Sequence, residues 1–196
     1  MSRLSKLPVE QWDPDLASMT QAETATDIEQ GITRMLAHCP EMAKGAIGFG
    51  AAIAMNRTLP ERLIELVRLR VAYHNQCRSC MAIRYASASQ DVNEDLVCSL
   101  EKPQEASDLS AAERAALDFA DRFATYHLSI TDDCFAGLRD HFDEAQTMEL
   151  LLHLALYVGM GRLAATLDMT EELPAGFRAP FGERVMPWSG TPLRVR

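Results

Sequence analysis

The sequence predicts an all-α fold, a single-domain bundle of about six to eight helices. Almost every periodic stretch has apolar residues at helical spacings of three and four, as in Leu63, Leu66 and Val67. No Asn-Gly or Asp-Gly pair lies between alternating apolar runs, so no β-hairpin is indicated. A length of 196 residues with 47% hydrophobic and 24% charged residues is typical of one globular domain, and excludes disordered chains and small disulfide scaffolds.

Helix boundaries in the first half follow from proline positions and apolar spacing. We expect a first helix over residues 21–38 and a second one that begins at Pro40, rich in Ala and Gly. Pro60 suits the first turn of a third helix, which the apolar pattern carries to about His74. A further helix is expected to resume near Cys77 and to continue through Tyr85.

Capping residues mark the helices of the second half. Ser110 and Glu113 form a capping box that opens a helix lasting to about His127. Thr131 is placed to cap a short helix, and Asp143 to cap a long one that ends near Leu167. These boundaries follow from local sequence alone.

The composition divides the chain into three parts. We expect an N-terminal arm over residues 1–20, the helical domain over 21–173 and a C-terminal tail over 174–196. The tail alternates prolines with aromatic residues, and we expect it to wrap this subunit or a neighbouring one. Its aromatic residues are Phe177, Phe181 and Trp188.

The charge balance excludes one class of partner. The chain has 19 Lys and Arg against 28 Asp and Glu, a formal net charge of -9, which is the wrong sign for binding nucleic acid through its phosphates. The N-terminal residues lack the apolar core of a secretory signal, and the apolar stretch 150–161 is shorter than a membrane span. We therefore expect a cytoplasmic protein without membrane contact, and five cysteines fit such a reducing compartment.

Cys77 and Cys80 are the residues with the clearest chemical meaning. A Cys-x-x-Cys at a helix start brings two thiols within reach of a disulfide and favours a reactive thiolate. Structural zinc is the competing interpretation, but it needs four ligands, and no second cysteine pair or histidine pair has matching spacing. We expect no metal and no cofactor, and we expect the remaining cysteines to be small buried residues.

The region around this pair resembles the carboxymuconolactone decarboxylase-like superfamily, in particular its alkylhydroperoxidase-D branch. Glu65 is followed after eleven residues by Cys77-Arg-Ser-Cys80, which is similar to the E-x11-C-x-x-C-x3-H pattern of that branch. The stretch 131–169, a short helix followed by a long one, is also similar to the family. The resemblance covers about residues 57–169.

The resemblance implies an all-helical subunit that forms trimers or hexamers and reduces hydroperoxides without a metal or flavin. It implies that Cys80 attacks the peroxide, that Cys77 resolves the sulfenic acid into a disulfide, and that Glu65 belongs to a proton relay. A dithiol protein or a small thiol would then restore the reduced pair.

The sequence departs from the family pattern at the motif histidine, which is Arg84 here. Arginine is always protonated, so Arg84 could stabilise a thiolate but could not shuttle a proton. His74 is the nearest titratable substitute, although a histidine at a helix end is also an ordinary capping residue. Glu65 likewise has an ordinary alternative, an ion pair with Arg62 or Arg68 on its own helix.

Three functional hypotheses therefore remain. The first is a thiol-dependent hydroperoxide reductase that uses Cys77 and Cys80. The second is a lyase similar to the lactone decarboxylase branch, in which the cysteine pair is incidental. The third is a redox-sensing oligomer without turnover, because the motif histidine is replaced by Arg84.

Overall fold

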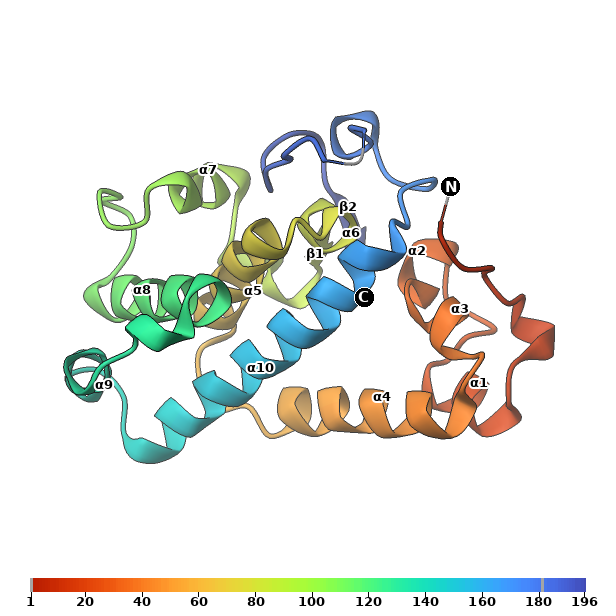
Figure 1. Cartoon of the computed structure of the whole chain (residues 1–196), viewed down its shortest axis with the longest axis horizontal. Helices are drawn as coiled ribbons and strands as arrows, with labels where there is room; N and C mark the ends of the chain where they lie inside the picture. Colours follow the sequence, from red (N-terminus) through yellow and green to blue (C-terminus); the bar gives the residue numbers. More distant parts are fainter. Residues whose placement is uncertain (1, 181) are drawn as a thin grey trace.

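The computed structural model describes residues 2–180 and 182–196 and confirms the all-α fold. Within these residues lie ten α-helices and two short strands, more helices than the six to eight expected (Figure 1). Several of the additional helices are single turns of four to six residues. The α-helices are α1 (Pro14–Met19), α2 (Asp27–Gln30), α3 (Thr33–Leu36), α4 (Pro40–Met55), α5 (Glu61–Asn75), α6 (Arg78–Ala82), α7 (Glu94–Cys98), α8 (Ala111–Thr125), α9 (Asp132–Arg139) and α10 (Glu144–Leu167), and the strands are β1 (Ile83–Tyr85) and β2 (Leu193–Val195).

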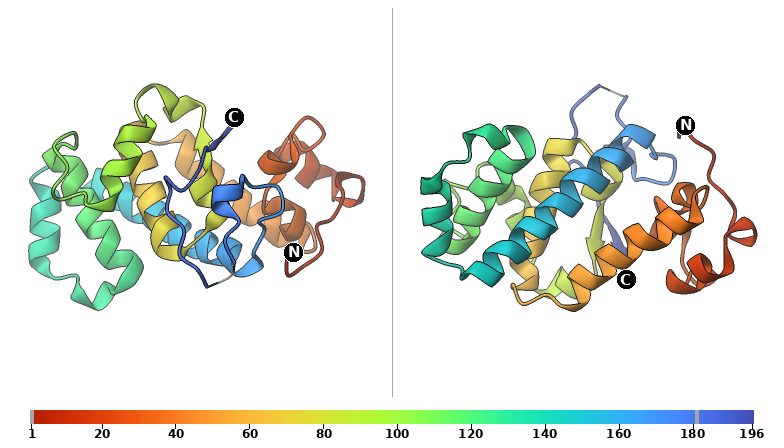
Figure 2. Two further views of the ribbon diagram at one scale, coloured as in Figure 1. Left: turned by 90° about the horizontal axis from the view of Figure 1, so that it is seen from above. Right: turned by 60° about the horizontal axis from the view of Figure 1, so that its bottom comes forward.

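Helix α5 lies at the centre of the molecule and packs against both α10 and α8. Leu66, Val67 and Leu69 of α5 are completely buried in this core, together with Leu117 of α8 and Leu150 of α10. The N-terminal helices form one end of the molecule, and α8 and α9 form the other (Figure 2). The cysteine pair follows directly after α5, so the best-packed helix supports the candidate site.

Two of the three predicted capping residues make their caps, whereas Thr131 directly precedes α9 but makes no side-chain cap hydrogen bond, so that prediction is wrong. Ser110 and Glu113 form a reciprocal capping box at the start of α8, and Asp143 forms one with Gln146 at the start of α10. Pro60 directly precedes α5. Each of these interactions satisfies backbone N–H groups within three residues, which is why the sequence predicts them.

The expected helix over residues 21–38 is wrong, because the chain breaks at Gly31. Gly31 has a φ of 44° and ends α2, and α3 follows as a separate short helix. A Cβ at this position would lie 3.3 Å from the carbonyl oxygen of Ile28, in a conformation that L side chains rarely adopt. The helix expected from Pro40 is confirmed as α4.

The helix expected through Tyr85 is also wrong. Helix α6 ends at Ala82, and Ile83–Tyr85 forms strand β1, which pairs in parallel with β2 and aligns Ile83 with Leu193. Arginine side chains bind the carbonyl oxygens near this junction: Arg68 binds those of Cys80 and Ile83, and Arg84 binds that of Met81. These partners and the returning tail replace the hydrogen bonds of a continued helix.

The C-terminal tail packs on its own subunit. Phe177 is completely buried beside Met81 and Ala82 of α6, and the Trp188 ring stacks on Tyr73 of α5 at a centroid distance of 6.4 Å. Phe181 lies outside the described residues. The tail therefore covers the helix that carries Cys80.

Helix α10 has 24 residues and a mean hydropathy of 1.5 over its most apolar window, so its length and composition would allow it to cross a membrane. The apolar stretch 150–161 considered in the sequence is only part of this helix. In the fold, α10 packs against α5, α6 and α8, and 33% of the apolar window is buried.

Replacement of Phe177 by Ala is predicted to lower the free energy of unfolding by about 3–5 kcal/mol, because it empties a completely buried aromatic site. Tyr126→Ala is the matched control, since Tyr126 is 61% exposed and its loss is expected to change stability by less than about 0.5 kcal/mol. Urea denaturation followed by circular dichroism measures both values. Equal effects of the two substitutions would contradict the packing of the tail on α6.

Candidate active site

Cys77 and Cys80 form a disulfide at the start of α6, with the Cα atoms 5.2 Å apart. Helix α5 ends at Asn75, and the next residue, Gln76, adopts a left-handed conformation and turns the chain into Cys77. Cys77 is the residue before the first turn of α6, and its Sγ accepts a hydrogen bond from the Cys80 N–H at 3.3 Å. The end of one helix and the start of the next thus bring the two sulfur atoms together.

The two cysteines differ in their access to solvent. Cys77 is completely buried, whereas Cys80 is only partly buried. Cys80 lines a cavity of about 400 Å³, and Cys77 does not. A small molecule in this cavity can therefore reach the Cys80 side of the disulfide.

Most of the wall of this cavity is aliphatic and comes from distant parts of the chain. The short helices α2 and α3, with α4, provide one side, and α10 provides another. Among the lining residues are Ile28, Leu36, Ile47, Leu156 and Met160. Such a wall suits the apolar part of a ligand and holds it beside the sulfur atom.

Glu65 and Arg68 form a buried ion pair next to the disulfide. The Arg68 Nε and Nη2 atoms donate to the two carboxylate oxygens of Glu65 at 2.6 and 2.7 Å. Arg68 Nη1 donates to the carbonyl oxygen of Cys80 at 2.7 Å, and Nη2 donates to that of Ile83 at 3.0 Å. Glu65 therefore reaches the cysteine segment through Arg68.

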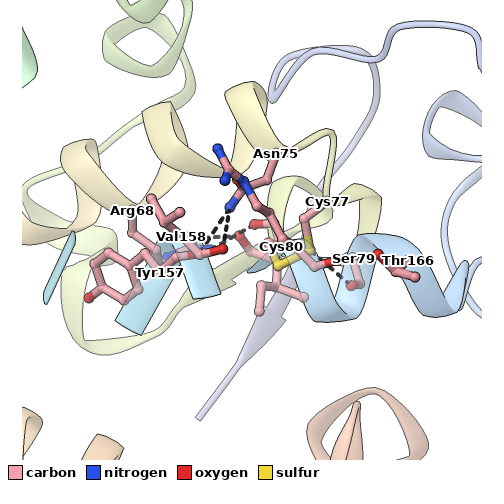
Figure 3. The surroundings of a disulfide bond; sticks show 10 residues. Arg68, Asn75, Cys77, Ser79, Cys80, Tyr157, Val158 and Thr166 are labelled. Carbon is pink, nitrogen blue, oxygen red and sulfur yellow. Dashed lines mark hydrogen bonds between the residues drawn. A yellow bond between two sulfur atoms is a disulfide. The ribbon is translucent and has the colours of Figure 1, made fainter. Parts of the chain in front are cut away.

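The environment of the Arg68 guanidinium keeps it protonated. Burial alone would lower its pKa, but the adjacent Glu65 carboxylate outweighs this and raises the pKa above its ordinary value. In Figure 3, Arg68 and Tyr157 lie on one side of the disulfide, and Ser79 and Thr166 lie on the other. A permanent positive charge thus stands on one side of the cysteine pair.

A second cavity, of about 370 Å³, adjoins the first and shares Arg68, Tyr85 and Tyr157 with it. Glu65 and His153 line only this second cavity. Of the two shared tyrosines, Tyr157 is hydrogen-bonded through its hydroxyl to His153 Nδ1 at 3.2 Å. Burial raises the pKa of the Tyr157 hydroxyl. Glu65 therefore lines a compartment next to the space in front of Cys80.

His74 and Arg84 both lie elsewhere and line neither cavity. His74 Nε2 is 2.7 Å from Asp121 Oδ1 of α8. The Arg84 guanidinium is bonded to Glu94 at 3.1 and 2.9 Å and donates to the carbonyl of Pro187 at 2.8 Å. Arg84 thus joins α7 and the tail to the end of α6, so among the five predicted site residues the structure gathers Cys77, Cys80 and Glu65.

From the sequence, Arg68 was expected only as an ordinary ion-pair partner of Glu65, and neither Tyr157 nor His153 was predicted as a site residue. The three-residue spacing between Glu65 and Arg68 is a signal for their pairing, but it does not reveal burial. Nothing in the local sequence indicates that Tyr157 lies between two cavities. Of the other cysteines, Cys39 and Cys98 are exposed and Cys134 is half-buried, so the expectation that they are buried is wrong.

Within the described part of the chain, no group of three or more His, Cys, Asp or Glu side chains is arranged to hold a metal ion. The Cys77–Cys80 disulfide itself offers the chemistry of its two sulfur atoms. A disulfide whose Cys80 side is open to a cavity can exchange with an external thiol, and after reduction Cys80 can act as a nucleophile.

The chain matches known sequences over only part of its length. No family model matches the chain. Two uncharacterized proteins of Mycobacterium tuberculosis, from strains H37Rv and CDC 1551, are 32% identical to it over 104 residues. This match covers 53% of the chain but only 37% of the length of those proteins.

Solved structures show the fold more clearly. A peroxidase-related protein of Ralstonia eutropha JMP134, described as an alkylhydroperoxidase AhpD core, matches over 95% of this chain and 96% of its own with a TM-score of 0.74 and 18% identity. A putative antioxidant defence protein AhpD of Agrobacterium tumefaciens matches over 71% of this chain and 97% of its own, with a TM-score of 0.63 and 20% identity. The resemblance inferred from the cysteine motif is thereby confirmed for the fold.

A debrominase named Bmp8 has the same fold. Its ligand-free structure covers 91% of this chain and 95% of its own chain, with a TM-score of 0.71 and 19% identity. A cysteine-to-alanine variant of that enzyme is known in complex with 2,3,4-tribromopyrrole. The fold therefore occurs in proteins described for different reactions.

His153 is predicted to make stability depend on pH. Burial lowers the pKa of its imidazole, and its Nε2 atom is buried without a hydrogen-bond partner in the described part of the chain. The unfolded chain takes up a proton near the ordinary pKa of about 6.5 while the folded chain does not, so this stabilisation is present above that pH and is lost as the pH falls below it.

We expect His153→Gln to reduce the loss of unfolding free energy between pH 7.5 and 5.5, a loss to which His153 contributes at most about 1.4 kcal/mol per pH unit. Urea denaturation at several pH values measures this. His127→Gln, at an exposed position, serves as the control and should leave the pH dependence as in the unmodified protein. An unchanged dependence in His153→Gln would contradict the prediction.

Proposed function

We propose that this chain, which has an AhpD-like fold of the carboxymuconolactone decarboxylase superfamily, is a thiol-dependent hydroperoxide reductase with a dithiol–disulfide cycle. The observation that carries the proposal is the asymmetry of the cysteine pair: Cys80 lines a cavity, whereas Cys77 is buried directly behind it. A pair of this kind separates an attacking cysteine from a resolving one.

In the oxidative half of the cycle, the Cys80 thiolate attacks the terminal oxygen of a hydroperoxide ROOH. A bond forms between sulfur and oxygen, the O–O bond breaks, and the alkoxide leaves and takes up a proton to give ROH. The Cys77 thiol then attacks the Cys80 sulfenic acid, forming the disulfide and releasing water. Together, two thiols and ROOH give one disulfide, ROH and water.

In the reductive half, an external dithiol restores the pair. Its thiolate attacks the Cys80 sulfur, which is the accessible one, and displaces the Cys77 thiolate. The second thiol of the donor then resolves the mixed disulfide, so that the donor leaves oxidised. A dithiol protein or a small thiol is the partner that this chemistry requires, and a reducing compartment such as the cytoplasm would supply it.

A second candidate function is reductive dehalogenation, and the aliphatic wall beside Cys80 is the observation that favours it. Here the thiolate would take the halogen from an activated ring carbon, a proton would replace it on the carbon, and Cys77 would displace halide from sulfur. Two thiols and R–Br would give a disulfide, R–H and HBr. The same two cysteines would serve both reactions, so substrate assays must separate them.

Two hypotheses from the sequence stay open beside these. A lyase would not need the cysteine pair, and a redox sensor would form the disulfide without turnover. Both are distinguished from the proposal by following disulfide formation and substrate consumption in the same sample.

We predict that Cys80→Ser abolishes hydroperoxide consumption, because it removes the nucleophile. Without an added thiol, Cys77→Ser should consume one equivalent of hydroperoxide to give Cys80 sulfenic acid and a second equivalent to give sulfinic acid, since no resolving thiol is present. Consumption of cumene hydroperoxide with dithiothreitol as reductant measures the first effect, and mass spectrometry of Cys77→Ser treated without dithiothreitol measures the second. Full activity of Cys80→Ser would remove the cysteine pair from the reaction.

One equivalent of cumene hydroperoxide is expected to convert fully reduced protein to the Cys77–Cys80 disulfide, with the loss of two hydrogen atoms. Intact mass and peptide mapping detect this product, and dithiothreitol should reverse it. A parallel sample with 2,3,4-tribromopyrrole tests dehalogenation. Disulfide formation with the bromopyrrole but not with the hydroperoxide would replace the first function by the second.

We also propose a homo-oligomer, a trimer or hexamer. Helix α4 supports this, because Met42 and Phe49, seven residues apart on one face, are 79% and 44% exposed and Ala43 is its one fully buried residue. Large apolar side chains that are exposed together favour association. Light scattering after size-exclusion chromatography tests the proposal, and a monomer at micromolar concentration would contradict it.

A further inference from the structure

Arg68 makes an unusual set of contacts for an arginine on a central helix. Its guanidinium binds one carboxylate, that of Glu65, and two backbone carbonyls, those of Cys80 and Ile83. These bonds use four of its five N–H groups, and the fifth belongs to Nη1, the atom that contacts Cys80. Arg68 also lines the cavity into which Cys80 opens.

The ion pair has a defined direction. The guanidinium bonds Glu65 through Nε and Nη2 and the Cys80 carbonyl through Nη1, so the positive member of the pair contacts the cysteine segment. Glu65 lines only the neighbouring compartment. A thiolate on Cys80 therefore meets the positive end of a buried ion pair, in surroundings where water screens the charge poorly.

The other charged groups around this cavity are held by different partners. On the N-terminal helices, Glu29 pairs with Arg196, and Arg34 pairs with Glu172 at 2.9 and 2.6 Å. Arg78 of α6 lines a different cavity, where it binds Asp168 and the carbonyl of Pro180. Tyr85 of β1 and Tyr157 of α10 also line the cavity in front of Cys80. Among the described residues, Arg68 is the charged side chain that is hydrogen-bonded to one of the two cysteine residues.

We propose that Arg68 is the cation that favours the thiolate form of Cys80, and that Glu65 positions Arg68 and does not carry the proton of the thiol. An opposite charge close to a thiol lowers its pKa, and a lower pKa gives more of the nucleophilic thiolate at neutral pH. The inference rests on the proposed function only in assigning Cys80 as the nucleophile.

The test measures the pKa of the Cys80 thiol in fully reduced protein and needs no hydroperoxide. The rate of alkylation by iodoacetamide is followed from pH 5 to 10. Trypsin cleaves after Arg70, Arg78 and Arg84, so Cys77 and Cys80 fall on separate peptides, 71–78 and 79–84. Mass spectrometry of the second peptide then reports Cys80 alone.

Arg68→Met is expected to raise the pKa of the Cys80 thiol by about one unit and to slow its alkylation at pH 7 by about tenfold. Arg68→Lys keeps the charge and should show a smaller change. Glu65→Gln is the discriminating variant: a positioning role predicts an alkylation rate at pH 7 that is equal to or faster than that of the unmodified protein, whereas a proton relay predicts a slower rate.

Arg70→Met is the matched control. Arg70 is on the same helix and makes equivalent contacts, two bonds to Asp121 at 2.6 and 2.9 Å and one to the carbonyl of Leu100 at 2.6 Å, but neither Arg70 nor these partners line the cavity in front of Cys80. Its replacement should leave the pH profile of Cys80 unchanged. An equal shift in Arg68→Met and Arg70→Met would assign the effect to lost packing and would overturn the proposal.

Removing one partner of a buried ion pair can prevent folding, so the double variant Glu65→Gln/Arg68→Met provides a second test without an unpaired buried charge. It is expected to raise the pKa of the Cys80 thiol as Arg68→Met does. An unchanged profile in a folded double variant would overturn the proposal. A protein that consumes no hydroperoxide but shows these shifts would refute the proposed function and leave the role of Arg68 intact.

Discussion

The buried ion pair between Glu65 and Arg68 joins the three segments that make the candidate site. Both residues belong to α5, and Arg68 reaches the last turn of α6 and the first residue of β1. Burying two charges costs several kcal/mol for each ion unless their bonds to each other and to nearby polar groups repay it. Here the carbonyl oxygens of Cys80 and Ile83 accept further hydrogen bonds from Arg68 and so stabilise the buried pair. The position of Cys80 therefore depends on an interaction that originates in the core helix.

Local chemistry explains which parts of the fold the sequence could predict. Capping at Ser110 and Asp143 involves groups within three residues, and the cysteine spacing already shows that the two sulfur atoms can meet. The helix break at Gly31 was missed because a glycine within an amphipathic pattern is also compatible with a continuous helix. Strand β1 was missed because its partner, residues 193–195, is distant in the sequence, and no alternating pattern marks so short a pair.

The candidate site also has residues that the sequence could predict and residues that only the fold reveals. Cys77 and Cys80 could be found from their spacing, and Glu65 could be found from the resemblance of this region to the family motif. The cavity in front of Cys80 could not, since its walls come from α2, α3, α4 and α10. Burial also decides which arginine matters: Arg62, Arg68 and Arg70 follow one another on α5, yet each binds a different acidic residue, and only the fold reveals which one faces the cysteines.

The bond from Arg84 to the carbonyl of Pro187 spans 103 positions of the chain. Contacts of such separation form late in folding, because a long loop must close before they are gained. Helices α5 and α8 can associate earlier through residues much nearer in sequence. The segment after Cys80 therefore depends on the tail for its final conformation, because both strand β1 and Arg84 are bonded to residues of the tail.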